Sequence, residues 1–152
     1  MEPGNLDKLS LMQELDEAFR QVRRLIFTEW NKNNVHGLGM THGKMLILLS
    51  EQGPQKASAL ADALSITSGA ITGIADRMIE LGYIKRERSE QDRRIVMMEL
   101  TEEGQALVSK IMKVRQELML KLFHGMSAEE MSQAIDIFRR MSVNLEEENT
   151  AE

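Results

Sequence analysis

The sequence contains no cysteine. This absence excludes disulfides, thiolate metal ligands, a cysteine nucleophile and a cysteine redox switch. Long apolar runs are also missing, since the longest purely aliphatic stretch is Met45–Leu49, far below the roughly 20 residues that cross a bilayer. Residues 1–10 lack a basic region followed by an apolar one, so they do not resemble a secretion signal. We therefore expect a soluble, cytoplasmic protein with no membrane association.

Negative charge is unevenly distributed along the chain. The net charge is −5, and Lys+Arg against Asp+Glu number 6 and 7 in residues 1–53, 7 and 7 in 54–100, and 6 and 10 in 101–152. The middle segment contains a dense group of basic residues: Arg77, Lys85, Arg86, Arg88, Arg93 and Arg94. Such a group can form a basic face on an acidic molecule and attract a polyanion.

Apolar residues at three-to-four spacing predict long amphipathic helices at both ends of the chain, over about 6–31 and over most of 101–148. Thr101 begins the first C-terminal helix, with acids in its first turn, where the helix dipole favours them. Residues 127–130, Ser-Ala-Glu-Glu, form a capping box for the final helix.

Shorter helices are expected between these ends. Thr41 is the expected N-cap of a second helix, which Gly53 and Pro54 end. A short helix over about 57–64 follows, and Thr67 caps a fourth helix that stops at residues 81–82. Five residues are expected to mark the buried face of this fourth helix: Ala70, Ile71, Ile74, Ala75 and Met78.

Two runs with strand character, residues 83–88 and 95–100, flank the polar segment Ser-Glu-Gln-Asp-Arg-Arg. They predict a hairpin with an arginine-bearing tip directly after a helix-turn-helix pattern. The expected fold class is therefore mainly α with a small β-hairpin wing (α+β). The winged helix-turn-helix would occupy residues 40–100, flanked by N- and C-terminal dimerisation helices at 6–31 and 101–148.

The outer helices carry more apolar surface than one small winged helix needs to cover its core. A two-fold homodimer explains this surplus economically, and a larger monomeric core is the alternative. The fourth helix has small or hydrogen-bonding residues on its other face: Ser68, Gly69, Thr72, Gly73, Asp76 and Arg77. Such a face fits the major groove of DNA, although it also fits a plain solvated surface.

Several segments resemble signatures of the MarR family of transcription regulators. They are Met-Thr-His-Gly-Lys at 40–44, residues 57–64, 70–78 and 81–86, and above all Asp-Arg-Arg at 92–94 followed by Leu-Thr-Glu-Glu-Gly at 100–104. The match covers about residues 40–107, while the outer helices agree in length and pattern. The resemblance implies a single MarR-like chain over 1–152.

The resemblance further implies a dimeric transcription regulator, usually a repressor, that binds a pseudo-palindromic operator in double-stranded DNA. By matched position, Arg94 would enter the minor groove, Asp92 would hold the wing tip in shape, and Arg77 would meet backbone phosphate. Arg88 and Arg93 complete the expected DNA-binding set. An arginine such as Arg94 is favoured in a narrow, negative minor groove. The alternative is that Asp92 and Arg94 form only an exposed surface salt bridge.

Glycines in the fourth helix depart from the family pattern. Gly73 stands where many relatives have a larger polar or basic residue, and Gly69 is a second glycine. Direct base recognition through this helix is therefore expected to be sparse. Each glycine weakens the helix by roughly 1 kcal/mol relative to alanine.

Many relatives respond to small anionic or aromatic effectors between the dimerisation helices and the winged helix. The candidate pocket residues are Phe19, Arg23, Trp30, His36, Met45 and Met112, most of which are ordinary core residues by their spacing. Zinc sensing through His36, His42 or His124 with Glu29 or Glu117 is a second possibility for regulation. No histidine pair has the close spacing of a helical metal site, so no metal or cofactor is expected.

Two other functional classes stay open at this level. A winged helix can serve as a protein-interaction module without sequence-specific DNA binding, with the basic wing against an acidic protein surface. An enzyme is not expected, because the serines and threonines lack a recognisable acid-base partner and the sequence has no phosphate-binding glycine loop.

Overall fold

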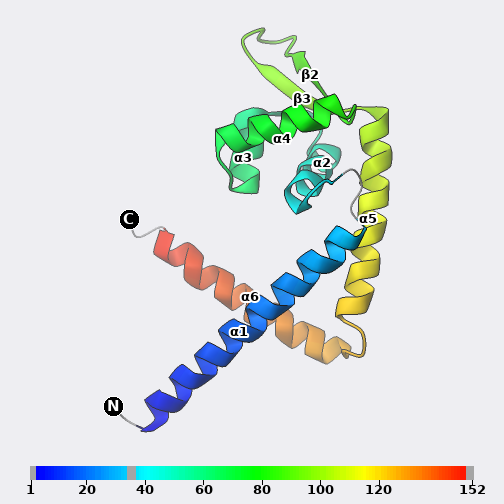
Figure 1. Ribbon diagram of the computed structural model, residues 1–152. Coiled ribbons are helices and arrows are strands. Elements are labelled where there is room, and N and C mark those ends of the chain that lie inside the picture. The colour runs from blue at the N-terminus through cyan, green and yellow to red at the C-terminus, as the bar shows by residue number, and fades with distance from the viewer. Residues whose placement is uncertain (1–2, 34–36, 150–152) are drawn as a thin grey trace. The chain divides into compact units, whose positions relative to one another are not determined.

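The computed structural model describes the backbone of residues 3–33 and 37–149 and the side chains of residues 7–33 and 37–147. The chain divides into two compact units, Met1–Gln116 and Glu117–Glu152. The elements are α1 (Pro3–Lys32), α2 (Met40–Gln52), β1 (Gln55–Lys56), α3 (Ala57–Leu64), α4 (Ser68–Glu80), β2 (Ile84–Arg88), β3 (Val96–Leu100), α5 (Glu102–Leu122) and α6 (Ala128–Asn149). All of them except the short β1 are labelled in Figure 1. The expected mainly helical fold with a small hairpin wing is confirmed.

A helix-turn-helix is formed by α3 and α4. Ser65 ends α3 in the left-handed conformation, with φ 53° and ψ 45°. Two residues later Thr67 caps α4, and its Oγ1 accepts a hydrogen bond from the Ala70 N–H at 3.2 Å. The two helices are bent by 110°, within the roughly 90–120° of this motif.

The wing is an antiparallel hairpin widened by a third strand. The strand order is β1-β3-β2, with Ile84 opposite Leu100 and Arg88 opposite Val96. Strand β1, which pairs Lys56 with Met97, was not predicted, because two residues are too short to show an alternating pattern. It attaches the start of α3 to the base of the wing.

Buried side chains from α2, α3, α4, the sheet and the first half of α5 form one core in the first unit. Its fully enclosed large residues are Met45, Leu46, Leu60, Ile71, Met78 and Ile84. On α4 the burial follows the predicted face at Ile71, Ala75 and Met78, but Ala70 is exposed. The core therefore fixes which face of α4 is turned outward.

The second unit contains the end of α5 and the helix α6. Gly125, with φ 80°, lies in the turn between them. The predicted capping box is present, since the Ser127 N–H donates to Glu130 Oε1 at 3.0 Å and the Glu130 N–H donates to Ser127 Oγ at 3.1 Å. None of the described side chains of this unit is buried. These helices therefore lack a core of their own.

The predicted cap of α2 was wrong. Helix α2 begins at Met40 with Gly39 as its N-cap, so Thr41 lies inside the first turn. Glycine is accepted at an N-cap, and the Gly39 N–H donates to Nδ1 of His42 at 3.3 Å. Gly53 ends the helix with φ 75°, as expected.

Among the described residues, no single helix is both long and apolar enough to cross a membrane. The bent pair α3 and α4 meets the criteria of length and composition only when its two helices are taken together.

Candidate nucleic-acid interface

The outward face of α4 consists of small or polar residues. Ser68, Gly69, Thr72 and Gly73 are all exposed, and an added Cβ at either glycine would meet nothing within 4 Å. Thr72 Oγ1 donates to the Ser68 carbonyl at 3.0 Å, so this hydroxyl is held along the helix. The glycines are therefore not required by packing within the chain, and the face is free for close approach of another surface.

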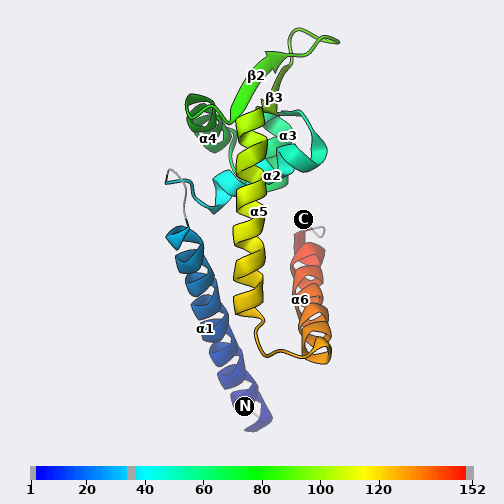
Figure 2. The same ribbon diagram turned by 90° about the vertical axis from the view of Figure 1, so that its right-hand side faces the viewer.

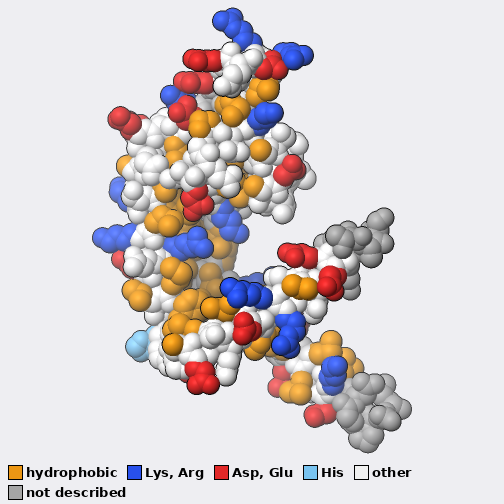
Figure 3. Space-filling view, turned by 180° about the vertical axis from the view of Figure 1, so that it is seen from behind, with side chains coloured by type: hydrophobic (Ala, Val, Ile, Leu, Met, Phe, Trp, Pro, Cys, Tyr) orange, Lys and Arg blue, Asp and Glu red, His pale blue; other side chains and the backbone are white. Residues whose placement is uncertain are grey.

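The tip of the wing, residues 89–95, is ordered by its own hydrogen bonds. The Ser89 N–H donates to the Ile95 carbonyl at 2.9 Å, and the Ile95 N–H donates to the Asp92 carbonyl at 3.0 Å. The Gln91 N–H donates to Ser89 Oγ at 3.3 Å. A short polar loop thus has a defined shape at the end of the wing, where basic side chains protrude beside acidic ones (Figure 3).

Asp92 and Arg94 form a two-point ion pair at this tip. Arg94 Nε donates to Asp92 Oδ1 at 3.1 Å, and Arg94 Nη2 donates to Oδ2 at 3.0 Å. The Arg94 backbone N–H also donates to Oδ1 at 3.0 Å. These bonds lower the pKa of the Asp92 carboxyl, the side-chain bond most and the backbone bond next. The carboxylate stays charged and orients the guanidinium, whose side chain is 90% exposed.

The other predicted arginines lie in three different settings. Arg88, the last residue of β2, donates from Nη1 to the Arg93 carbonyl at 2.8 Å, so its side chain stabilises the backbone of the loop. Arg93 is exposed. Arg77, on the last turn of α4, has Nη1 3.4 Å from Glu80 Oε2 in an exposed pair. This hydrogen bond from Arg88 depends on the conformation of the loop, which the spacing of residues in the sequence does not reveal.

Lys56 is a basic residue near the tip that the sequence reading missed. Strand β1 places it beside β3, opposite Met97. It is exposed, and its charge contributes to the lowered pKa of Asp92. Only the unpredicted strand brings it there, because it is separated from the wing by almost thirty residues in sequence.

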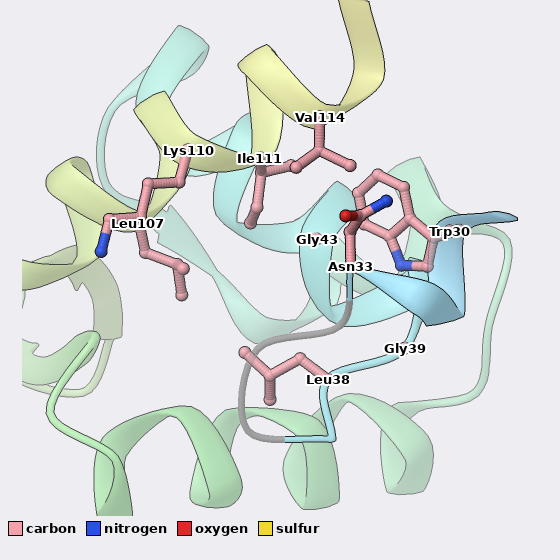
Figure 4. A pocket seen from close by; sticks show the side chains of 9 residues that line it. All are labelled: Trp30, Asn33, Leu38, Gly39, Gly43, Leu107, Lys110, Ile111 and Val114. Atoms are coloured by element: carbon pink, nitrogen blue, oxygen red, sulfur yellow. The ribbon is translucent and has the colours of Figure 1, made fainter. Parts of the chain in front are cut away.

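A small cavity lies where the end of α1 meets α2 and α5. Its volume is about 30 Å³, and its lining residues are Trp30, Asn33, Leu38, Gly39, Gly43, Leu107, Lys110, Ile111 and Val114. Figure 4 shows the indole of Trp30 beside Val114, with apolar side chains making up most of the wall. A cavity of this size holds roughly one or two water molecules. As observed, it is too small for an organic effector.

The six residues predicted for an effector pocket are not gathered in one place. Trp30 lines the cavity, whereas Met45 is fully buried in the core and Met112 is 44% exposed on α5. Arg23 lies over the ring of Phe19 at 5.3 Å on the exposed face of α1. His36 lies outside the described residues.

No cluster of three or more histidine, aspartate or glutamate side chains suited to a metal ion occurs in the described part of the chain. His42 is instead used in the first turn of α2, where neutral Nδ1 accepts the Gly39 N–H. Its pKa is lowered, mainly by burial and further by the positive charge of Arg77. This histidine therefore favours the neutral form in the folded protein.

The lowered pKa of His42 predicts a loss of stability in acid. Above the unfolded-state pKa of about 6.5 both states are neutral at this residue, and its full contribution is present. As the pH falls below that value the unfolded chain takes up the proton first, so the free energy of unfolding declines until the pH reaches the lower folded-state pKa. Urea unfolding from pH 8 to pH 5 should show a smaller decline for His42→Gln than for the parent. Parallel curves would contradict this assignment.

Comparisons with known proteins agree with this geometry. A family model described as MarR family matches residues 38–96, from the start of α2 to the wing. YpoP of Bacillus subtilis (strain 168), an uncharacterized helix-turn-helix-type transcriptional regulator, is 28% identical over 134 residues, covering 88% of this chain and 95% of the relative.

Two solved structures show the same fold. FabT of Streptococcus pneumoniae, in complex with DNA, has a TM-score of 0.79 at 23% identity and covers 90% of this chain and 98% of its own. BpsR of Bordetella bronchiseptica, whose DNA binding is regulated by 6-hydroxynicotinic acid, has a TM-score of 0.73 at 20% identity, with 84% and 91% covered. Residues 38–96, which contain the helix-turn-helix and the first strands of the wing, are therefore similar to the MarR family, and the chain as a whole is similar to a helix-turn-helix-type transcriptional regulator.

Proposed function

We propose that this protein is a dimeric, effector-responsive repressor that binds a pseudo-palindromic operator through α4 in the major groove and the wing tip in the minor groove. The observation that carries the proposal is the ordered tip, in which Asp92 holds an otherwise exposed Arg94 in a fixed orientation. A preorganised arginine loses little freedom on entering a narrow groove. The surface salt bridge alone would contribute little to stability.

The exposed face of α4 supports the major-groove assignment. Ser68 and Thr72 lie one helical turn apart and offer hydroxyls, while Gly69 and Gly73 have no side chain to hold the helix away from base edges. Arg77 lies on the last turn, where it can meet a phosphate at the groove wall. The backbone contacts would set position, and the few hydroxyls would give modest base selectivity.

Exposed apolar side chains support the homodimer. On α1 they include Leu15 at 56% and Phe19 at 40% exposure, and on α6 Ile135 at 48% and Phe138 at 52%. Large apolar residues repeated along helices are rarely left in water by a stable monomer. We propose that a second copy of the chain covers this apolar surface, so that the dimer presents two identical DNA-binding units. Because such a dimer has two-fold symmetry, its DNA site would be an inverted repeat.

Selection of random duplex DNA by the purified protein tests this assignment. We expect the retained pool to contain an inverted repeat whose half-sites lie about one helical turn apart, roughly 10 base pairs centre to centre. Light scattering should give the mass of two chains, and transcription from a promoter carrying the selected site should fall as protein is added. A single-chain mass or a pool without sequence preference would contradict the proposal.

The effector site is proposed at the cavity bounded by α1, α2 and α5. Trp30 supplies a flat apolar wall and Lys110 is the one cationic residue among those that line the cavity, a combination that suits a small aromatic anion once the cavity widens. Trp30 is the single tryptophan of the chain, so its fluorescence reports on this site alone.

Titration with 6-hydroxynicotinic acid is expected to change the Trp30 emission saturably and to weaken operator binding in parallel. Lys110→Met should bind the acid less tightly, because the anionic group loses its partner, while Lys8→Met serves as a matched control on α1. An emission that follows the acid only linearly, or equal binding by both variants, would place the effector elsewhere.

A further inference from the structure

An ion pair joins the proposed recognition helix to the wing. Arg86 of β2 donates from Nη2 to Oδ1 of Asp76 on α4. The register supports this orientation, since Arg86 stands opposite Met98, which is 4% exposed and belongs to the core. Residues opposite each other in a sheet share a face, so Arg86 lies on the face of the wing that is turned towards the core.

Asp76 occupies an unusual place for an acid. Ser68, Thr72 and Asp76 are spaced four residues apart on α4 and therefore form one row along the helix. All three are exposed. A helix laid into the major groove along this row brings a carboxylate near the phosphates, where negative charge opposes binding. The guanidinium of Arg86 neutralises that charge in place.

The contribution of this pair to folding is small. The side chains of Arg86 and Asp76 are 39% and 57% exposed, and ion pairs this exposed contribute little to stability. The pair instead fixes the orientation of β2 relative to α4, because it joins Arg86 of the strand to Asp76 on the outward side of the helix. The relative orientation of α4 and the wing decides whether both can enter adjacent grooves of one duplex.

We propose that Asp76 and Arg86 are positioning residues that lock α4 and the wing in the orientation needed for operator DNA, and so determine discrimination between operator and random sequence. This inference rests on the proposed function, in which α4 and the wing contact the same half-site. Non-specific binding needs only positive charge near phosphate. Specific binding needs both reading elements in register at once.

The test compares operator and random-duplex affinities for Asp76→Asn, Arg86→Gln and the double variant at one salt concentration. Removing the acid in Asp76→Asn should tighten random binding by simple electrostatics, whereas the lost lock should weaken operator binding. The ratio of the two affinities is expected to fall by about tenfold, an effect typical of coupled neighbours. The double variant should be no worse in this ratio than either single variant.

Asp62→Asn on α3 is the matched control, because it removes an exposed acid from the same helix-turn-helix without touching the wing. It should change both affinities by the same factor. Thermal unfolding of all variants should stay close to the parent, which separates a positioning role from a structural one. Equal tightening of both DNAs by Asp76→Asn, or additive effects in the double variant, would overturn the proposal. If the parent itself shows no preference for a selected site, the proposed function fails instead.

Discussion

Gly104→Ala is expected to destabilise the fold by about 3 kcal/mol or more, as for severe overpacking. An added Cβ at residue 104 would lie 2.1 Å from the carbonyl oxygen of Tyr83 and 3.0 Å from Cδ2 of Leu100. The first contact is with backbone, which a rotamer change cannot relieve. Urea unfolding of the variant should show the loss as a lower midpoint or as failure to fold.

The backbone near Gly104 cannot easily move away, because α5 is bound there to the turn after α4. The Thr101 N–H donates to the Tyr83 carbonyl at 3.1 Å, Thr101 Oγ1 donates to the Gly82 carbonyl at 2.6 Å, and the Gly104 N–H donates to Thr101 Oγ1 at 3.0 Å. Figure 2 shows the start of α5 against the base of the wing.

Gly73→Ala is the matched control for this prediction. Its added Cβ meets nothing within 4 Å, so the variant should be more stable by about 1 kcal/mol through helix propensity alone. Equal effects of the two substitutions would show that the close contact at Gly104 does not determine stability.

Arg94→Ala is expected to weaken operator binding on the order of 10- to 100-fold, since one good base-edge contact contributes about 1–3 kcal/mol. Stability should hardly change, because the side chain is 90% exposed and its ion pair lies at the surface. Titrations of a labelled operator at fixed salt give the affinity, and urea unfolding gives the stability.

Two further variants separate shape from charge at this position. Arg94→Lys keeps the charge but loses the planar fork that Asp92 holds at two points, so it should recover only part of the affinity. Arg20→Ala removes an arginine from a comparable exposed pair with Asp16 on α1 and should leave binding unchanged. Full recovery by lysine would contradict the orienting role of Asp92.

Local signals in the sequence predicted most of the fold. The Thr67 cap, the Ser127 capping box and the hairpin flanking residues 89–94 were each specified by residues adjacent in sequence, and the structure has them within a residue or so. The Thr41 cap was wrong because a histidine three residues after Gly39 satisfied its N–H. A threonine near a helix start does not reveal that competition.

The features that the sequence did not reveal depend on contacts between distant segments. Lys56 reaches the wing only through β1, and Arg86 meets Asp76 only because the wing folds against α4. Residue type alone predicted the effector pocket, but Met45 is buried in the core and Trp30 lines a small cavity. An apolar or aromatic residue suits the core and a pocket wall equally well, and only the packing of the folded chain determines which of the two it occupies.

Methylation interference with dimethyl sulfate on the selected operator tests the central claim most directly. The reagent marks guanine N7 in the major groove and adenine N3 in the minor groove. We predict interference at guanines where α4 lies and at flanking adenines where the wing tip lies, with loss of the adenine signal alone in Arg94→Ala. Interference confined to the major groove, or an adenine signal that persists in the variant, would contradict insertion of the wing arginine into the minor groove.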